Sequence, residues 1–417
     1  MDKPLINQNL DISPYRFVIE AIIFFTYLAF GLTWSAAGVF LPDLMKELSL
    51  TLSQASFTNT SVTLAKFAGP LATGFVLQKL GLKKSFTLAS FLICLGILAP
   101  LSHSYELILA ARFTMGIGGA LVVVLFTPLV MEWFPANEKV IANGLNYIAL
   151  SIGMMLGLAF TDSLMNYFEG SWKMVLVTYS SLSIIMFITW LLGGREGPLE
   201  CQKCSAERKV ESGSEKASFF QALKNINTWK LTLSYSGVLS LYMVLITYFP
   251  TFYKTRGWSQ INPLFLKAPA LVMITSVPTI AIAIWFAHKI QLRKPLLKIA
   301  GLAIVPGVFG MFLYRDLTVV FIGAILTGIG MFFWRPALFT IPQELPGVNT
   351  RDAGHIMGIF WAVSYAVSTL NVWLVGRITE LTGSFIPGFT FIAIFSSSML
   401  MGAYLLPETG PGKFDSE

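Results

Sequence analysis

The chain alternates long apolar runs with short polar segments along almost its whole length. A helix needs about 20 mostly apolar residues to cross the hydrocarbon core of a bilayer, and twelve runs approach or exceed that length. The pattern therefore predicts an all-α membrane protein with twelve transmembrane helices. The runs cover approximately residues 17–41, 55–78, 86–102, 107–131, 139–164, 173–192, 229–252, 264–287, 297–313, 317–339, 354–377 and 385–406.

A polar, basic segment divides these runs into two groups of six. Residues 193–228 lack the apolar pattern and carry several lysines and arginines among serines and glutamates. We therefore expect an N-terminal six-helix half over residues 1–192, a cytoplasmic linker over 193–228 and a C-terminal six-helix half over 229–417. In transporters built from two such halves, the substrate binds near the bilayer midplane between them.

Composition and charge agree with a membrane protein and exclude other classes. Charged residues make up 12% of the chain, whereas soluble domains contain about a quarter. The net charge of +7 comes mostly from short loops between apolar runs, which is the pattern that orients helices rather than one that binds nucleic acid. The distribution predicts a multi-pass protein of a bacterial-type inner membrane with both termini cytoplasmic, a monomer without a nucleic-acid partner. No cleavable leader is recognisable before the first run, which we expect to be retained.

No motif indicates a metal, a cofactor or an enzyme. Cys94 lies in an apolar run, and Cys201 and Cys204 form a single C-x-x-C pair in the linker. A structural zinc site needs four ligands, and no nearby histidine completes one, so we expect reduced thiols. A phosphate-binding G-x-x-x-x-G-K-[ST] loop is missing from the sequence, which argues against transport driven by ATP hydrolysis.

The junction between the second and third runs carries the most specific motif. Gly74, Gln78, Gly81, Lys83 and Lys84 resemble the G-x-x-x-D-x-x-G-R-K signature of major facilitator superfamily transporters, with glutamine in place of aspartate and a leucine before the two lysines. A weaker, basic echo follows the eighth run at residues 287–294. The resemblance implies two six-helix halves, alternating access and a gating role for this junction.

Two further stretches strengthen the resemblance. Arg112 followed by Gly116 is similar to a second superfamily pattern in the fourth helix. Residues 133–135 and 143–146, Trp-Phe-Pro and Asn-Gly-Leu-Asn, resemble members that carry nitrate, cyanate and other small anions. The superfamily's first, fourth, seventh and tenth helices line the cavity, which makes candidates of Tyr27, Trp34, Tyr242, Tyr248 and Trp334.

Lys66 is the main candidate for binding a solute. It lies about 12 residues into the second run, or roughly 18 Å deep at a rise of 1.5 Å per residue. A charge at that depth costs about 2.5–3.5 kcal/mol and usually faces a cavity or a partner. Asn59, Thr63 and Thr73 share its helical face, and no carboxylate lies at comparable depth. An anionic solute is one counter-ion for Lys66, and an interhelical salt bridge or carbonyl contact is the alternative.

The remaining polar positions carry weaker predictions. Arg112 is expected to pair with Asp162, and either to hold the fourth helix or to bind solute. Glu20, near the cytoplasmic start of the first helix, either favours that helix start or, like Asp162, takes part in proton coupling. Trp361, Tyr365 and Ser368 form a stripe on the eleventh helix, which either lines the cavity or packs. Arg335 and Lys267 are expected near opposite membrane faces, where they snorkel or gate.

Together these patterns predict a secondary transporter that moves a small anionic or polar solute by alternating access, with H⁺ as the candidate coupling ion. Two alternatives stay open. The aromatic content suits an exporter of amphipathic drugs or siderophores, and the polar linker permits a membrane receptor that transports nothing.

Overall fold

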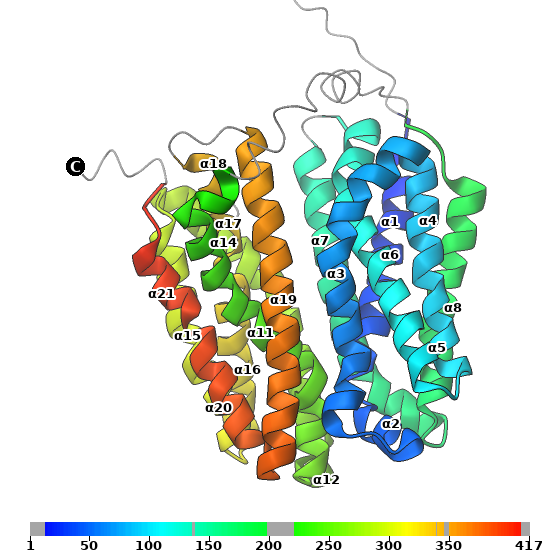
Figure 1. Ribbon diagram of the computed structural model, residues 1–417, viewed down its shortest axis with the longest axis vertical. Coiled ribbons are helices and arrows are strands. Elements are labelled where there is room, and N and C mark those ends of the chain that lie inside the picture. Colours follow the sequence, from blue (N-terminus) through cyan, green and yellow to red (C-terminus); the bar gives the residue numbers. More distant parts are fainter. Residues whose placement is uncertain (1–12, 136–137, 198–220, 339, 346–349, 410–417) are drawn as a thin grey trace, which may run out of the picture.

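Two bundles of long, roughly parallel helices stand side by side in the computed structural model (Figure 1). The structure describes residues 13–135, 138–197, 221–338, 340–345 and 350–409, and all regular structure within these ranges is helical. The all-helical, two-half fold predicted from the sequence is therefore confirmed.

The N-terminal bundle contains six membrane-length helices. They are α1 (Arg16–Ala36), α3 (Leu52–Leu80), α4 (Leu82–Cys94) continued by η1 (Leu95–Ile97) and α5 (Leu98–Leu101), α6 (Tyr105–Trp133), α7 (Lys139–Tyr167) and α8 (Trp172–Gly193). A short amphipathic helix that the sequence reading missed, α2 (Leu41–Leu48), connects α1 to α3.

The C-terminal bundle repeats this plan with more interruptions. It consists of α11 (Ile226–Thr255), η2 (Pro263–Lys267) with α13 (Ala268–Ile274) and α14 (Ser276–Ile290), α15 (Lys294–Leu313), α16 (Leu317–Phe332) with α17 (Arg335–Leu338), α19 (Thr350–Thr382), and α20 (Phe385–Ser396) with α21 (Ser398–Leu405). The short helices α12 (Trp258–Ile261) and α18 (Ile341–Glu344) lie in connections. Most of the predicted linker, including Cys201 and Cys204, lies outside the described residues.

Eleven helical stretches in the described part of the chain are long and apolar enough to cross a membrane. The remaining long helix is α3, which has 29 residues and lies beside α6 and α19. The part of α3 up to residue 67 carries serines, threonines, an asparagine and Lys66. Those side chains face other helices rather than lipid, since Asn59, Thr63 and Lys66 are all buried.

Helix interruptions follow some of the prolines but not all. Proline removes a backbone donor and can kink or interrupt a helix, and three prolines of the C-terminal half follow a change in helix geometry. Pro269 and Pro278 follow the boundaries that open α13 and α14, and Pro336 follows the break before α17. The other three, Pro128, Pro250 and Pro306, lie within continuous helices.

Glycines bring helices of the N-terminal half into close contact. A methyl group on Gly153 would lie 2.1 Å from the Leu28 carbonyl oxygen of α1, and one on Gly119 would lie 2.3 Å from the Phe30 ring. Small residues allow this backbone approach in membrane bundles. The α1–α6–α7 packing therefore excludes larger residues at these positions.

The signature junction is a turn of one residue. Helix α3 ends at Leu80 and α4 begins at Leu82, and Gly81 between them has φ +75° and ψ 172°. This region of backbone space is open essentially only to glycine. The Ser85 hydroxyl donates a hydrogen bond of 2.6 Å to the Gly81 carbonyl. The side chains of Thr73 and Gln78, and the surroundings of Gly74, lie outside the described part, so the gating role of this junction stays a prediction.

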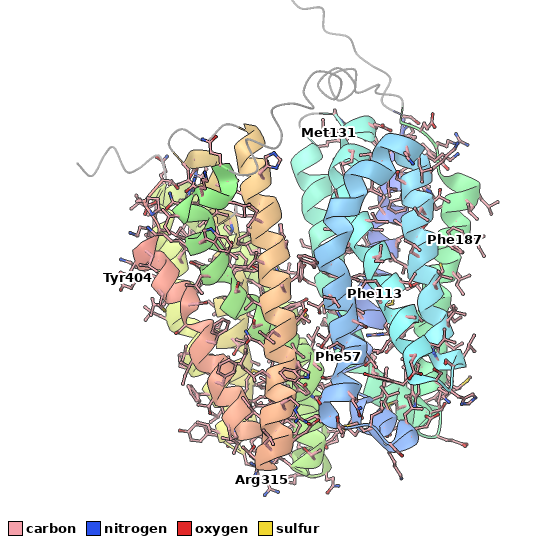
Figure 2. The ribbon with its side chains drawn as sticks, in the orientation of Figure 1. Phe57, Phe113, Met131, Phe187, Arg315 and Tyr404 are labelled. Atoms are coloured by element: carbon pink, nitrogen blue, oxygen red, sulfur yellow. The ribbon has the colours of Figure 1, made fainter. Side chains whose placement is uncertain are left out.

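The two ends of the molecule are distinguishable. Helices α2 and α12 mark one end, where Figure 2 also shows Arg315, and α17, α18 and Met131 mark the other. We call the first the α2/α12 end.

Candidate functional site

Lys66 is a buried cation that has no polar partner within the described part of the chain. It lies fourteen residues from each end of α3 and is only 5% exposed. Its ammonium nitrogen is 4.1 Å from the centroid of the Trp34 ring and 5.1 Å from that of Phe30, both on α1. Among the described residues, no carboxylate or carbonyl pairs with it. Aromatic faces attract a cation, but they leave its hydrogen-bonding capacity unused.

Arg112 on α6 holds the surroundings of Lys66 in place. It is 2% exposed and donates hydrogen bonds to the carbonyls of Thr33, Trp34 and Thr58, each at 3.0 Å, and to the Asn59 side-chain oxygen at 3.1 Å. The Thr33 and Trp34 carbonyls belong to the last turn of α1, where carbonyls lack helical partners. The guanidinium therefore fixes the backbone that carries Trp34.

The predicted pairing of Arg112 with Asp162 is wrong. Asp162 on α7 instead forms an ion pair of 3.0 Å with Lys254 on α11. The sequence prediction relied on similar depths of the two side chains. Depth alone does not indicate that the end of α1 presents free carbonyls, which accept the hydrogen bonds of the Arg112 guanidinium.

The other polar side chains of the Lys66 face connect the two halves. Asn59 donates a hydrogen bond of 3.0 Å to the Thr247 hydroxyl, and Thr63 donates one of 3.3 Å to the Met243 sulfur, both on α11. The polar face predicted on α3 therefore meets the C-terminal half, and its part in binding solute stays a prediction.

The halves are joined firmly at the α2/α12 end. Lys254 bridges to Asp162 and also donates to the Val39 carbonyl at 3.1 Å. The backbone N–H of Ser53 donates to Glu380 at 2.7 Å. Further contacts run from Thr251 to the Gly38 carbonyl and from Lys267 to the Ala159 carbonyl.

Gly38 is the tightest point of this closure. A methyl group on Gly38 would lie 1.8 Å from the Ile246 carbonyl oxygen of α11, so only glycine fits while the halves are in contact here. The structure is thus closed at the α2/α12 end. Asp162 and Lys267 both make contacts between the halves at this end. Their spacing in the sequence does not predict these contacts.

Aromatic rings dominate the facing part of the C-terminal half. Trp361 and Tyr365 of α19 are stacked at 5.6 Å, and Trp361 packs edge-on at 5.3 Å against Tyr235 of α11. Both α19 rings are half-buried. The stripe predicted on this helix therefore contacts α11, while Ser368 donates to the Leu239 carbonyl.

The other aromatic candidates differ in role. The Tyr242 hydroxyl donates across the halves to the Met154 sulfur of α7. Tyr248 is fully buried and donates to the Val372 carbonyl, so it packs α11 against α19. Trp334 is also buried, 5.0 Å from Tyr235.

Glu20 is buried rather than placed at a solvated helix start. It is 8% exposed, and within the described residues its carboxylate oxygens form no hydrogen bond of standard geometry. The Asn146 side chain of α7 lies close by, and its amide atoms also lack partners. A buried carboxylate is costly unless a neighbouring group such as the Asn146 amide can donate to it. The sequence singled out Glu20 as a candidate. Asn146 was noted only as the last residue of the Asn-Gly-Leu-Asn stretch, without a role beside Glu20.

The fold and site define a membrane protein of two helical halves with a buried cation near their interface. Residues 23–371 match the family model of the Major Facilitator Superfamily. The chain belongs to this superfamily, as its junction motif predicted.

Individual proteins agree with this assignment. An uncharacterized protein of Campylobacter jejuni, Cj0987c, is 30% identical over 75% of this chain and 96% of its own length. The hexuronate transporter of Escherichia coli K12 is 24% identical over 94% of this chain and 92% of its own. The crystal structure of a D-xylose-proton symporter superposes with a TM-score of 0.74 at 18% identity, over 96% of this chain and 99% of that one.

We predict that Gly38→Val opens the α2/α12 end, because the added side chain cannot coexist with the Ile246 carbonyl at its present position. Alternative conformers of one protein typically differ by a few kcal/mol, so the population closed at this end should fall by about tenfold or more. Distances between spin labels at the exposed positions Lys46 and Gln260 measure the change.

Gly237→Val is the matched control. A methyl group on Gly237 would lie 2.3 Å from the Phe395 carbonyl, a clash within the C-terminal half. It should lower thermal stability while leaving the Lys46–Gln260 distance distribution unchanged. Identical distance distributions for Gly38→Val and the unsubstituted protein would show that Gly38 does not control the closure.

Proposed function

We propose that the protein is a secondary transporter of small organic anions, with carboxylated sugars as the first class to test. The observation that carries this proposal is Lys66, a buried ammonium group at mid-helix whose described surroundings offer aromatic faces and no counter-charge. A solute carboxylate supplies the missing acceptor. The hexuronate transporter among the relatives carries substrates of this class.

The neighbouring rings suit the rest of such a solute. Trp34 and Phe30 lie beside the Lys66 ammonium, and Trp361 and Tyr365 present partly exposed rings from the other half. A sugar ring has apolar C–H faces and polar hydroxyls at its edge, and such a face packs on aromatic surfaces of this kind. An amphipathic drug or siderophore would use the rings without needing Lys66, so dependence on this lysine separates the two substrate classes.

Alternating access gives the closed end its role. The contacts of Lys254, Ser53 and Gly38 hold the halves together at the α2/α12 end, and release of solute toward that end requires them to break. We infer that the Gly81 turn, with Lys83 and Lys84, governs this exchange at the opposite end, because its backbone conformation restricts how α3 and α4 move relative to each other.

We predict that Lys66→Met abolishes measurable binding of glucuronate. Loss of one partner of a buried charge pair costs about 2–5 kcal/mol, which weakens binding roughly 30-fold or more. The variant should still fold, because it removes an uncompensated intramembrane charge. Lys66→Arg should keep partial affinity, since the charge remains while the donor geometry changes. Calorimetric titration of the purified protein measures both.

Lys289→Met is the matched control for this substitution. Lys289 also lies over a tryptophan ring, 5.2 Å from the centroid of Trp285, but both side chains are exposed. It should bind glucuronate normally. If Lys66→Met folds poorly while its folded fraction binds with ordinary affinity, Lys66 is structural and the anion proposal loses its support. Binding of lipophilic cations instead of glucuronate favours the exporter alternative, and no binding at all favours a receptor.

We propose that Glu20 carries the coupling proton, because it is a buried carboxylate without a hydrogen-bond partner beside Asn146. Glu20→Gln, a neutral isostere, should reduce solute uptake driven by a pH gradient at least tenfold while leaving solute exchange at equal pH intact. Uptake and counterflow in proteoliposomes distinguish the two. Glu106→Gln, at an exposed surface carboxylate, should leave both unchanged. Equal loss of uptake and counterflow in Glu20→Gln would assign Glu20 a structural role.

We propose that the α17/α18 end and both termini face the cytoplasm of a bacterial inner membrane, since the basic loops gather there. In a variant without native cysteines, a thiol at the exposed Glu196 position should be protected from a membrane-impermeant reagent added to intact cells. A thiol at the exposed Arg315 position, at the α2/α12 end, should react. The reverse labelling pattern would invert the proposed orientation.

A further inference from the structure

Beside Lys66 lies a second buried donor, the indole N–H of Trp34. Trp34 is 1% exposed, and within the described part of the chain its Nε1 atom forms no hydrogen bond. The Lys66 ammonium nitrogen lies 4.1 Å from the centroid of the same ring. One small region between α1 and α3 therefore contains two donors, an ammonium group and an indole N–H, and no acceptor from the described residues pairs with either.

Other tryptophans in the described residues have acceptors for their N–H groups. Trp172 donates to the Glu47 carboxylate at 2.7 Å, and Trp190 donates to the Thr87 hydroxyl at 3.0 Å. A buried tryptophan usually finds such a partner, because an unpaired donor in a dry interior has lost its hydration without compensation. The N–H of Trp34 is therefore a group that an acceptor from outside the chain can satisfy.

The orientation of the Trp34 ring is fixed by its surroundings. Arg112 donates hydrogen bonds of 3.0 Å to the carbonyls of Thr33 and Trp34, which holds the backbone at this point. The ring of Phe30, one turn earlier, packs against that of Trp34 with the centroids 5.5 Å apart. A donor held in this way loses little conformational entropy on binding. The Lys66 ammonium, on its flexible four-carbon stem, can move to meet a ligand.

A carboxylate suits this pair of donors. Its two oxygens accept hydrogen bonds in different directions, so one can accept from the ammonium group while the other accepts from the indole N–H. Hydrogen bonds to a charged group are stronger than those between neutral groups, and the burial of both donors strengthens the electrostatic attraction. A solute hydroxyl could accept from the indole but would leave the charge of Lys66 uncompensated.

We propose that the Trp34 indole N–H is a solute-binding donor, which together with Lys66 holds one carboxylate of the transported anion through both of its oxygens. This inference rests on the proposed function and deepens it. Lys66 supplies the charge and Trp34 supplies the direction, so the site selects a planar anion with two acceptor oxygens. Binding moves the ammonium group from the face of the Trp34 ring toward its N–H edge.

Removal of the N–H with retention of an aromatic ring tests this assignment. Trp34→Phe keeps a ring beside Lys66 and should weaken glucuronate binding about tenfold, the loss expected for one hydrogen bond to a charged group. Benzothienylalanine incorporated at position 34 replaces the N–H by sulfur in a bicyclic ring of similar shape, and should weaken binding by the same factor. Calorimetric titration measures both affinities, and a thermal melting curve establishes that each protein is folded.

Nuclear magnetic resonance of the isotope-labelled indole N–H groups reports the contact directly. The Trp34 signal, identified by its loss when Trp34 is replaced, should move downfield on addition of glucuronate, because the proton becomes hydrogen-bonded to a carboxylate. Glucose, which has no carboxylate, should leave the signal in place. A merely structural role of Trp34 would not produce this difference between the two sugars.

Trp133→Phe is the matched control. Trp133 is also buried, its N–H forms no hydrogen bond within the described residues, and its ring packs against Tyr15 at 5.9 Å, away from Lys66. Its replacement should leave glucuronate affinity unchanged. If glucuronate binds but the Trp34 signal does not move, or if the benzothienylalanine protein binds it with ordinary affinity, the indole donor is overturned while the proposed function stands. If the unsubstituted protein does not bind glucuronate, the proposed function and this inference fail together.

Discussion

The constraint on which this structure depends is the compensation of positive charge inside the bundle. Arg112 is satisfied completely by carbonyls at the end of α1 and by Asn59. Lys66 lies over the ring of the same Trp34, and among the described residues it contacts aromatic faces without a hydrogen-bond acceptor. The first cation holds the end of α1 in place, whereas the second has no acceptor among the described residues. A buried cation without an acceptor in the protein is suited to reversible binding of an anion.

The same residues connect the site to the closed end. Asn59 accepts a hydrogen bond from Arg112 and donates one to Thr247 on α11. Trp34, whose carbonyl Arg112 holds, lies one helical turn before Gly38, where α1 meets α11 most closely. A solute that draws Lys66 away from the Trp34 ring would thus alter the turn of α1 that packs against the opposite half. Binding of solute at Lys66 would in this way affect the nearby contacts between the halves that must break during exchange.

The sequence was sufficient for the helices and for Lys66 but not for the partners of polar side chains. Apolar run lengths locate the twelve helices because the requirement to span a bilayer is local and strong. The junction between the second and third helices was likewise recognisable from its motif, which contains Gly81. The pairing of Asp162 with Lys254 was not, since it depends on how two halves separated by a long linker meet.

Arg335 is a residue whose depth in the membrane could not be inferred by counting residues along the sequence. Its position in the tenth run suggested a membrane face, because counting residues assumes one continuous helix. A break separates α16 from α17 at that point, and the Arg335 guanidinium carbon lies 4.6 Å from the centroid of the Phe332 ring. Non-helical backbone at membrane depth is tolerated where protein or a cavity surrounds it. The interruption therefore leaves Arg335 after the end of α16, half-buried and over the Phe332 ring.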